Sequence, residues 1–292
     1  MATRTQKVNR AIVLLTAAVT MPLLMPRRAL TPRFISPSLL VGGPSAAAAG
    51  QAPQNKGGGV SAEKERLFLR KFTWQSISKA WRETEFHLSE KDIKKETRSF
   101  GVPHGEKSSF FIKKMGYLEI APNLYIINYR QIYQRNREYF PALSSALLLS
   151  SALPPGEEPL FAFLLFVQQI QYKRPPKYYE GRFIDCFFTP LICLYEQYGD
   201  CDSKSLLLAE FLTTLPGARE KVAMIVASRF STTHSILAVD RKPLPGMTTL
   251  YNPGKGYFIP LETSAPGWSP GFISRNVAEL IRKGKIFFID LN

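Results

Sequence analysis

Cysteine and histidine are scarce in this chain of 292 residues, and their scarcity excludes several kinds of protein. The only three cysteines are Cys186, Cys193 and Cys201, and the only three histidines are His87, His104 and His234. There is no Cys-x-x-Cys pair, and so few ligands argue against a Cys/His zinc site. Three cysteines allow at most one intramolecular disulfide, which excludes a scaffold held together by several of them.

Acidic residues are absent from residues 1–60, which carry seven basic residues. The whole chain has 38 Lys and Arg against 23 Asp and Glu, a net charge of +15, so residues 61–292 carry only +8. In that part no Lys/Arg cluster alternates with aromatic residues as a nucleic-acid groove would require. The sequence therefore predicts no nucleic-acid partner, and an exported nucleic-acid binder would rest on net charge alone.

The one apolar run near the start, residues 11–25, is too short to span a bilayer. As a helix it would be about 22 Å long, against a hydrocarbon core of roughly 30 Å. Because basic residues precede it, we interpret residues 1–28 as a secretory signal peptide, and the alternatives are an uncleaved anchor or a transit peptide. The expected location is exported, in the periplasm or cell envelope, with membrane contact only through this segment if it stays uncleaved. Residues 29–60, rich in Pro, Ser, Ala and Gly, read as a flexible linker.

Globular composition begins at Ser61, and residues 61–140 are interpreted as an N-terminal accessory region. Alternating aromatic and charged residues predict a strand pair within residues 68–89. Ser89 and Asp92 resemble a helix-start box, and Gly101 would end that helix. A second helix is expected after Pro122, with apolar positions running from Leu124 to Tyr133. Two apolar runs, residues 142–153 and 160–170, are predicted to be buried helices.

Residues 141–292 are interpreted as the main domain. An apolar helix is expected at residues 190–198, and an amphipathic helix is expected to start at Cys201. Strand-like segments follow at residues 222–227, 235–239, 248–251, 257–261 and 286–291. Helices first and an antiparallel sheet afterwards predict an α+β fold.

Three residues together suggest nucleophilic chemistry: Cys201, His234 and Glu262. A helix N-terminus at Cys201 can stabilise a thiolate, and its free N–H groups can bind an oxyanion. His234 opens a predicted strand and could accept the thiol proton, while Glu262 ends another strand and could orient the imidazole. Asp200 and Asp202 flank the nucleophile; we interpret them as helix caps, and their charge would oppose thiolate formation.

The segments that carry these residues resemble the bacterial transglutaminase-like domain. They are GDCDSKSLLL from Gly199, Thr233-His234-Ser235, and YFIPLETS from Tyr257 with Pro266-Gly267-Trp268. The stretch FVQQIQY, which ends at Tyr172, resembles that family's leading helix. The resemblance covers residues 160–273 and implies a papain-like core, with the nucleophile at a helix N-terminus and the other two members of the triad on adjacent strands.

Carried over to this chain, the resemblance makes Cys201 the nucleophile, His234 the general base and acid, and Glu262 the third member. The family's commonest third residue is Asp, so Glu262 departs from the pattern by one methylene. Asp240, on the same face of the same strand as His234, is the alternative third member. The candidate oxyanion donors beyond the Cys201 amide are Gln169, Gln197 and Tyr198.

The resemblance implies a thiol-dependent acyl transfer through a Cys thioester, without metal or organic cofactor. We expect hydrolysis of a peptide, isopeptide or other amide bond in a peptide or protein substrate, as by a cysteine protease or amidase, rather than cross-linking by an acyltransferase. The alternative is a catalytically inert binding or scaffold protein of the cell envelope that retains the fold. The sequence predicts no oligomeric state.

Overall fold

A long hairpin starts the described part of the chain. The computed structural model describes residues 33–34, 65–154, 156–229 and 232–292. The predicted signal segment and almost all of the predicted linker therefore lie outside the described residues. In the hairpin, β2 (Leu67–Gln75) pairs antiparallel with β3 (Trp81–Ser89), from Leu67↔Ser89 to Gln75↔Trp81. Alternate residues are buried along β3, so the predicted strand pair is confirmed and has one core-facing side.

Helix α1 (Glu90–Ser99) begins where the serine cap predicts. The Ser89 hydroxyl accepts a hydrogen bond from the Asp92 N–H at 3.3 Å, which satisfies one of the free N–H groups of the first turn. The helix ends at its C-cap Phe100, directly before Gly101. The predicted start and end of this helix are confirmed.

The helix expected from Leu124 is wrong over its first four residues. Residues Leu124–Ile127 form β6, which pairs antiparallel with β5 (Tyr117–Ala121) and parallel with β1 (Arg33–Phe34). Helix α3 (Tyr129–Asn136) begins only after Asn128, whose side chain caps it by accepting from the Gln131 N–H. Isoleucine and tyrosine favour strands, and the neighbouring β5 provides the partner. Helix α2 (Ser109–Lys114) precedes β5.

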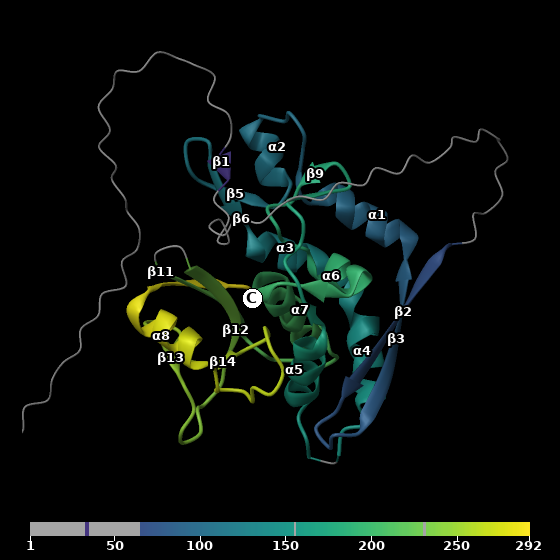
Figure 1. Ribbon diagram of the computed structural model, residues 1–292, viewed down its shortest axis with the longest axis vertical. Coiled ribbons are helices and arrows are strands. Elements are labelled where there is room, and N and C mark those ends of the chain that lie inside the picture. Colours follow the sequence, from purple (N-terminus) through teal and green to yellow (C-terminus); the bar gives the residue numbers. More distant parts are fainter. Residues whose placement is uncertain (1–32, 35–64, 155, 230–231) are drawn as a thin grey trace, which may run out of the picture. The chain divides into compact units, whose positions relative to one another are not determined.

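Four helices form the layer that carries the candidate nucleophile. They are α4 (Phe140–Ser151), which follows the short helix η1 (Arg137–Tyr139), α5 (Pro159–Gln169), α6 (Pro190–Glu196) and α7 (Cys201–Thr213). Both predicted apolar helices are thus present, and burial is confirmed for α5, whereas α4 is exposed along one side, with Leu149 82% exposed. Helix α7 lies between the other helices and the sheet (Figure 1), and every one of its residues is buried. The amphipathic character predicted for α7 is therefore wrong, because neighbours cover it on all sides.

A five-stranded antiparallel sheet forms the other layer, in the order β13-β14-β12-β11-β15. Its strands are β11 (Val222–Arg229), β12 (Thr232–Asp240), β13 (Leu250–Asn252), β14 (Gly256–Leu261) and β15 (Lys285–Asp290). Leu237 and Leu261 belong to the core shared with α7, whereas Ile236 and Phe258 pack in a second cluster with α8 (Arg275–Lys283). Helix α8 was not predicted. The α+β class is confirmed.

Short strands also pair outside the five-stranded sheet. Strand β7 (Gln171–Tyr172) pairs parallel with β10 (Tyr198–Gly199), and β9 (Arg182–Phe183) pairs with β4 (Val102–Pro103) and β8 (Tyr178–Tyr179). One core cluster contains residues from both sides of position 140, so residues 65–140 are packed onto the main domain. Among the described residues, no helix has the length and apolar character needed to cross a membrane.

Candidate functional site

Cys201 is the first residue of α7, and the chain reaches it through a tightly packed glycine. A Cβ atom on Gly199 would lie 2.8 Å from the Cys193 Sγ and 2.9 Å from the Ser203 Cβ, so only glycine fits there without displacement. The next residue, Asp200, is the N-cap: its Oδ1 accepts from the Ser203 N–H at 3.2 Å and from the Ser203 hydroxyl at 2.8 Å. The thiol therefore occupies a fixed position at a helix start.

The start of α7 lies against an open stretch of β12. Strand β12 pairs with β11 along nearly its whole length, but with β14 only from Leu237 to Asp240. Beside the unpaired stretch, the Ser205 hydroxyl lies 3.5 Å from the Ser235 carbonyl, and the Ser235 N–H acts on the Cys201 thiol to lower its pKa. Since Ser235 is the next residue after His234, the start of α7 lies beside the strand that carries the predicted base.

His234 and Glu262 contact each other directly. The His234 Nε2 lies 3.2 Å and 3.3 Å from the two carboxylate oxygens of Glu262, which is only 1% exposed. The Ser264 N–H and hydroxyl donate to the same carboxylate at 3.1 Å and 2.7 Å. Burial acts to raise the pKa of Glu262, but the hydrogen bonds and charge of His234, with those of Ser264, hold it below its ordinary value.

The ionised Glu262 fixes the tautomer of the imidazole. A carboxylate only accepts hydrogen bonds, so the His234 Nε2 carries the proton that faces it. The other ring nitrogen, Nδ1, is then an acceptor, and within the described part of the chain no hydrogen-bond partner occupies it. This arrangement leaves His234 able to take one proton while Glu262 stabilises the resulting cation.

The Cys201 thiol is protonated at rest. Burial is the largest cause that raises its pKa well above the ordinary value, followed by the charges of Asp202 and Asp200, while the Ser235 N–H acts in the opposite direction. The sulfur donates a hydrogen bond to the Asp202 Oδ1 at 3.2 Å. The charges of both flanking carboxylates act in the direction that the sequence predicts, against thiolate formation.

The two flanking carboxylates differ in their surroundings. Asp202 accepts a hydrogen bond from the buried Tyr129 hydroxyl as well as from the thiol. Asp200 is buried beside Asp202, and burial together with this like charge raises the pKa of Asp200 to about 7. The predicted capping role is confirmed for Asp200, whereas Asp202 directly contacts the nucleophile.

Tyr172 is a site residue that the residue-level prediction missed. Burial, followed by the influence of the nearby Cys201 thiol, raises the pKa of its phenol. The side chain is 51% exposed, so the phenol remains a hydrogen-bond donor at the solvent side of the thiol. Tyr172 ends the sequence FVQQIQY that carries part of the family resemblance, and this position was the available signal.

Gln168 and Lys204 hold the surrounding backbone. The Gln168 amide donates to the carbonyls of Glu262 and Trp268 at 2.8 Å and 2.7 Å. The fully buried Lys204 ammonium donates to the carbonyls of Gln168 and Ile170 at 3.1 Å and 2.9 Å, at the C-terminus of α5. Burial lowers the pKa of Lys204 to about 8. These contacts fix the segment that presents Glu262 relative to α5.

The predicted oxyanion donors lie elsewhere, because their side chains bind other groups. The Gln169 side chain bonds to the backbone N–H and carbonyl of Gln75, at 2.7 Å and 2.9 Å. The Gln197 amide donates to the Lys71 carbonyl at 3.1 Å. The Tyr198 ring packs against Phe188, with 5.2 Å between the ring centroids. None of the three has a hydrogen bond to the thiol among the described residues.

Asp240 is also remote from the imidazole. It is six residues from His234 along β12, and an extended strand rises about 3.3 Å per residue, which separates the two by about 20 Å. Its carboxylate lies 3.9 Å from the Lys221 ammonium instead. The structure therefore places Glu262, and not the alternative Asp240, beside His234.

Replacing Asp202 with Asn is expected to speed alkylation of Cys201 by iodoacetamide about tenfold at pH 7.5. The substitution removes the carboxylate that accepts from the thiol, and a tenfold change corresponds to about one pKa unit. Wild type should show a rate that keeps rising from pH 7 to 9, since its thiol pKa is raised. Asp92→Asn, in the first turn of α1, is the matched control. An unchanged rate for the Asp202 variant would contradict the electrostatic argument.

Within the described residues, no group of three or more His, Cys, Asp or Glu side chains is placed to hold a metal ion. The comparisons with protein-family models and with curated proteins find no significant match. The candidate function is therefore inferred from the arrangement of Cys201, His234 and Glu262.

Proposed function

We propose that this chain is a thiol-dependent acyl-transfer enzyme with a papain-like, transglutaminase-like core. The observation that carries the proposal is the His234–Glu262 pair, in which the His234 Nε2 lies 3.2 Å from the carboxylate. His234 is the residue before Ser235, whose N–H acts on the Cys201 thiol. A nucleophile at a helix start, a base on a neighbouring strand and a buried carboxylate behind the base are the three roles that covalent acyl transfer requires.

The first half-reaction forms a thioester. The Cys201 sulfur attacks the carbonyl carbon of an amide while its proton moves to the His234 Nδ1. The carbonyl oxygen becomes an oxyanion, for which the Cys201 N–H and the Tyr172 hydroxyl are the proposed donors. The C–N bond then breaks, and the imidazolium gives its proton to the leaving amine. Glu262 stabilises the imidazolium without taking its proton.

The second half-reaction regenerates the thiol. Water gives a proton to the His234 Nδ1 as its oxygen attacks the thioester carbon, and the C–S bond breaks with return of that proton to the sulfur. The products are a carboxylic acid and the free enzyme. We propose hydrolysis of a peptide, isopeptide or other amide bond because water is the acceptor that requires no binding site of its own.

The raised thiol pKa determines how the first step must proceed. Because burial and the carboxylates of Asp202 and Asp200 disfavour the thiolate, a preformed thiolate–imidazolium pair is not the resting state. Proton transfer to His234 accompanies nucleophilic attack, as general-base catalysis, and the basicity of His234 contributes directly to the rate.

The test uses p-nitrophenyl acetate, an activated acyl donor that needs no substrate-binding groove. We expect release of p-nitrophenolate together with the gain of one acetyl group on Cys201, followed by its hydrolysis, as seen by intact-mass spectrometry. Cys201→Ala should remove both signals, whereas Cys186→Ala, which changes a half-buried cysteine outside the triad, should keep both. Acetylation of other residues alone, or none, would overturn the proposal.

One observation favours the alternative of an inert binding or scaffold protein. The resting thiol donates to Asp202, which is the arrangement of a stable, unreactive cysteine. In that case Cys201→Ala would preserve the protein's biological role and the acetyl group would not transfer. Export through residues 1–28 and a place in the cell envelope belong to both hypotheses.

A further inference from the structure

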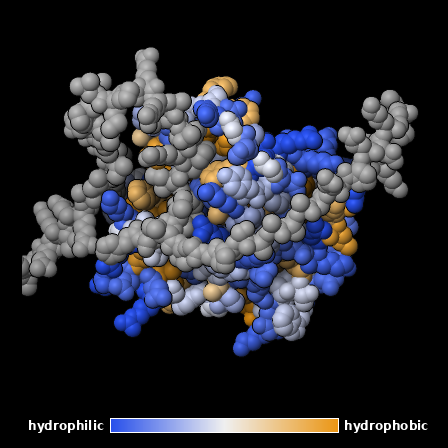
Figure 2. Space-filling model, turned by 45° about the horizontal axis from the view of Figure 1, so that its top comes forward, coloured by the Kyte–Doolittle hydropathy of each residue, from blue (hydrophilic) through white to orange (hydrophobic). Residues whose placement is uncertain are grey.

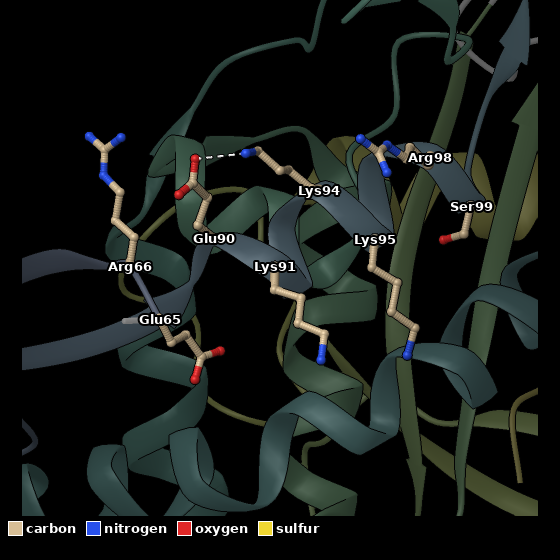
Figure 3. A pocket seen from close by; sticks show the side chains of 8 residues that line it. All are labelled: Glu65, Arg66, Glu90, Lys91, Lys94, Lys95, Arg98 and Ser99. Atoms are coloured by element: carbon tan, nitrogen blue, oxygen red, sulfur yellow. Dashed lines mark ion pairs between the residues drawn. The ribbon is translucent and has the colours of Figure 1, made fainter. Parts of the chain in front are cut away.

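A basic face on α1, far along the chain from the triad, has no role in the proposed acyl transfer. Lys91, Lys94, Lys95 and Arg98 occupy positions i, i+3, i+4 and i+7 of the helix, which places them on its exposed side. Ile93 and Glu96 occupy the buried side. Figure 3 shows Lys91 and Lys95 projecting side by side and Lys94 and Arg98 reaching in another direction.

This basic face lines an open hollow of about 960 Å³, to which Glu65 and Arg66, the two residues before β2, also contribute. With Glu90, five cationic and two anionic side chains line the hollow, a net charge of +3. Hydrophilic residues predominate at the upper right of Figure 2, the side on which α1 lies in Figure 1. The hollow therefore concentrates positive charge in a concave surface.

Three of the five cations have no ion pair among the described residues, and one of these, Arg66, lies over the Phe68 ring. Lys94 pairs with Glu90 at 2.9 Å, and Lys95 pairs with Glu138 at 2.7 Å. Among the described residues, Lys91 and Arg98 have no ion pair and no side-chain hydrogen bond. They are seven residues apart, which corresponds to about 10 Å along the helix axis.

We propose that this hollow binds an acidic polypeptide segment of a partner protein. In a polyproline II segment, with three residues per turn and a rise of about 3.1 Å per residue, acidic residues three positions apart share one face and lie about 9 Å apart. One of them can then face Lys91 while the next faces Arg98. A flat anionic membrane would fit this concave surface poorly, and the carboxylates of Glu65 and Glu90 would repel it. Among the described residues none that lines the hollow is aromatic, so these residues offer a single-stranded nucleic acid no stacking surface of the kind that such sites use.

Binding is tested by fluorescence anisotropy of the full chain with a labelled peptide of four Asp-Ser-Gly repeats. The expected result is saturable binding to wild type that weakens with salt, and loss of at least tenfold in affinity in Lys91→Gln/Arg98→Gln. The matched control is Arg219→Gln/Lys242→Gln, which removes the same charge from two exposed residues outside the hollow. A peptide of Asn-Ser-Gly repeats should not bind.

Three outcomes would overturn the proposal. They are absence of saturable binding by wild type, equal loss of affinity in both double variants, and retention of wild-type affinity in Lys91→Gln/Arg98→Gln. Vesicles with anionic phospholipid and single-stranded RNA are titrated in parallel, and preferential binding of either would reassign the face. Thermal unfolding of each variant shows that the comparison is between folded proteins. The result is independent of the acetyl-transfer test, because neither Lys91 nor Arg98 belongs to the triad.

Discussion

Replacing His234 with Asn is expected to slow acetylation of Cys201 by p-nitrophenyl acetate by about two to four orders of magnitude. The variant keeps a polar side chain on β12 but has no group that can accept the thiol proton. The effect should be large because the thiol, with its raised pKa, depends on a base during attack. The measurement is the rate of p-nitrophenolate release in the first turnover, followed by the rate of loss of the acetyl group.

Two variants make this result specific to the triad. His87→Asn changes an exposed histidine on β3 and should keep both wild-type rates. Glu262→Gln should fall between wild type and the His234 variant, because Gln can still hold the imidazole but does not stabilise its cation. Equal rates for His234→Asn and wild type would show that Cys201 reacts without a base, and the triad assignment would then be wrong.

The parts of the site that the sequence predicts are those determined by local chemistry. Ser89 and Asp200 each cap a helix by accepting the N–H of the residue three positions later, a contact that depends only on neighbouring residues. The positions of α1 and α7 could therefore be predicted. The start of α7 places Cys201, and the strand pattern around His234 and Glu262 is equally local.

The parts that could not be predicted depend on which side of an element faces the site. Gln168 and Gln169 are neighbours on α5 and point about 100° apart around the helix axis. Packing directs Gln168 to the Glu262 carbonyl and Gln169 to Gln75, and nothing in the sequence distinguishes them. Tyr172 lies near the start of α7 because β7 pairs with β10 directly before that helix, and this pairing joins segments that are distant in the sequence.

Burial also overrides what local patterns suggest. The polar residues of α7 imply one solvent-facing side, yet Lys204 and Glu210 are 0% exposed. Lys204 has a clear role, since it binds the free carbonyls at the end of α5. Glu210 does not: neither of its carboxylate oxygens has a hydrogen-bond partner among the described residues.

Glu210 should consequently make the protein less stable as the pH rises. Burial raises its pKa well above the ordinary 4.5, with the charge of Glu96 adding to burial and that of Arg137 opposing it. The folded chain then holds a proton that the unfolded chain releases above pH 4.5. Protonated Glu210 therefore leaves the free energy of unfolding unaffected by pH below pH 4.5. Above that pH the free energy of unfolding falls by about 1.4 kcal/mol for each pH unit, until the pH reaches the folded-state pKa.

Glu210→Gln is therefore expected to stabilise the protein at neutral pH. The amide has nearly the same shape as the protonated carboxyl and needs no proton uptake, so the gain should be near zero at pH 4.5 and grow, by at most about 1.4 kcal/mol for each pH unit, as the pH rises toward the folded-state pKa of Glu210. Urea unfolding of wild type and variant at several pH values gives the two free energies of unfolding. A difference that does not change with pH would contradict a protonated Glu210.

Glu96→Gln is the contrasting variant, because Glu96 is just as buried but fully partnered. Its carboxylate bonds to the Arg135 guanidinium at 2.9 Å and to the Asn136 amide at 3.0 Å. Replacing Glu96 breaks this buried ion pair and leaves the Arg135 guanidinium without its partner. A loss of about 2 kcal/mol or more in the free energy of unfolding is therefore expected. The same substitution would then change the free energy of unfolding in opposite directions at two fully buried glutamates. That result would show that hydrogen-bond partners, and not burial alone, decide whether a buried carboxylate stabilises this protein.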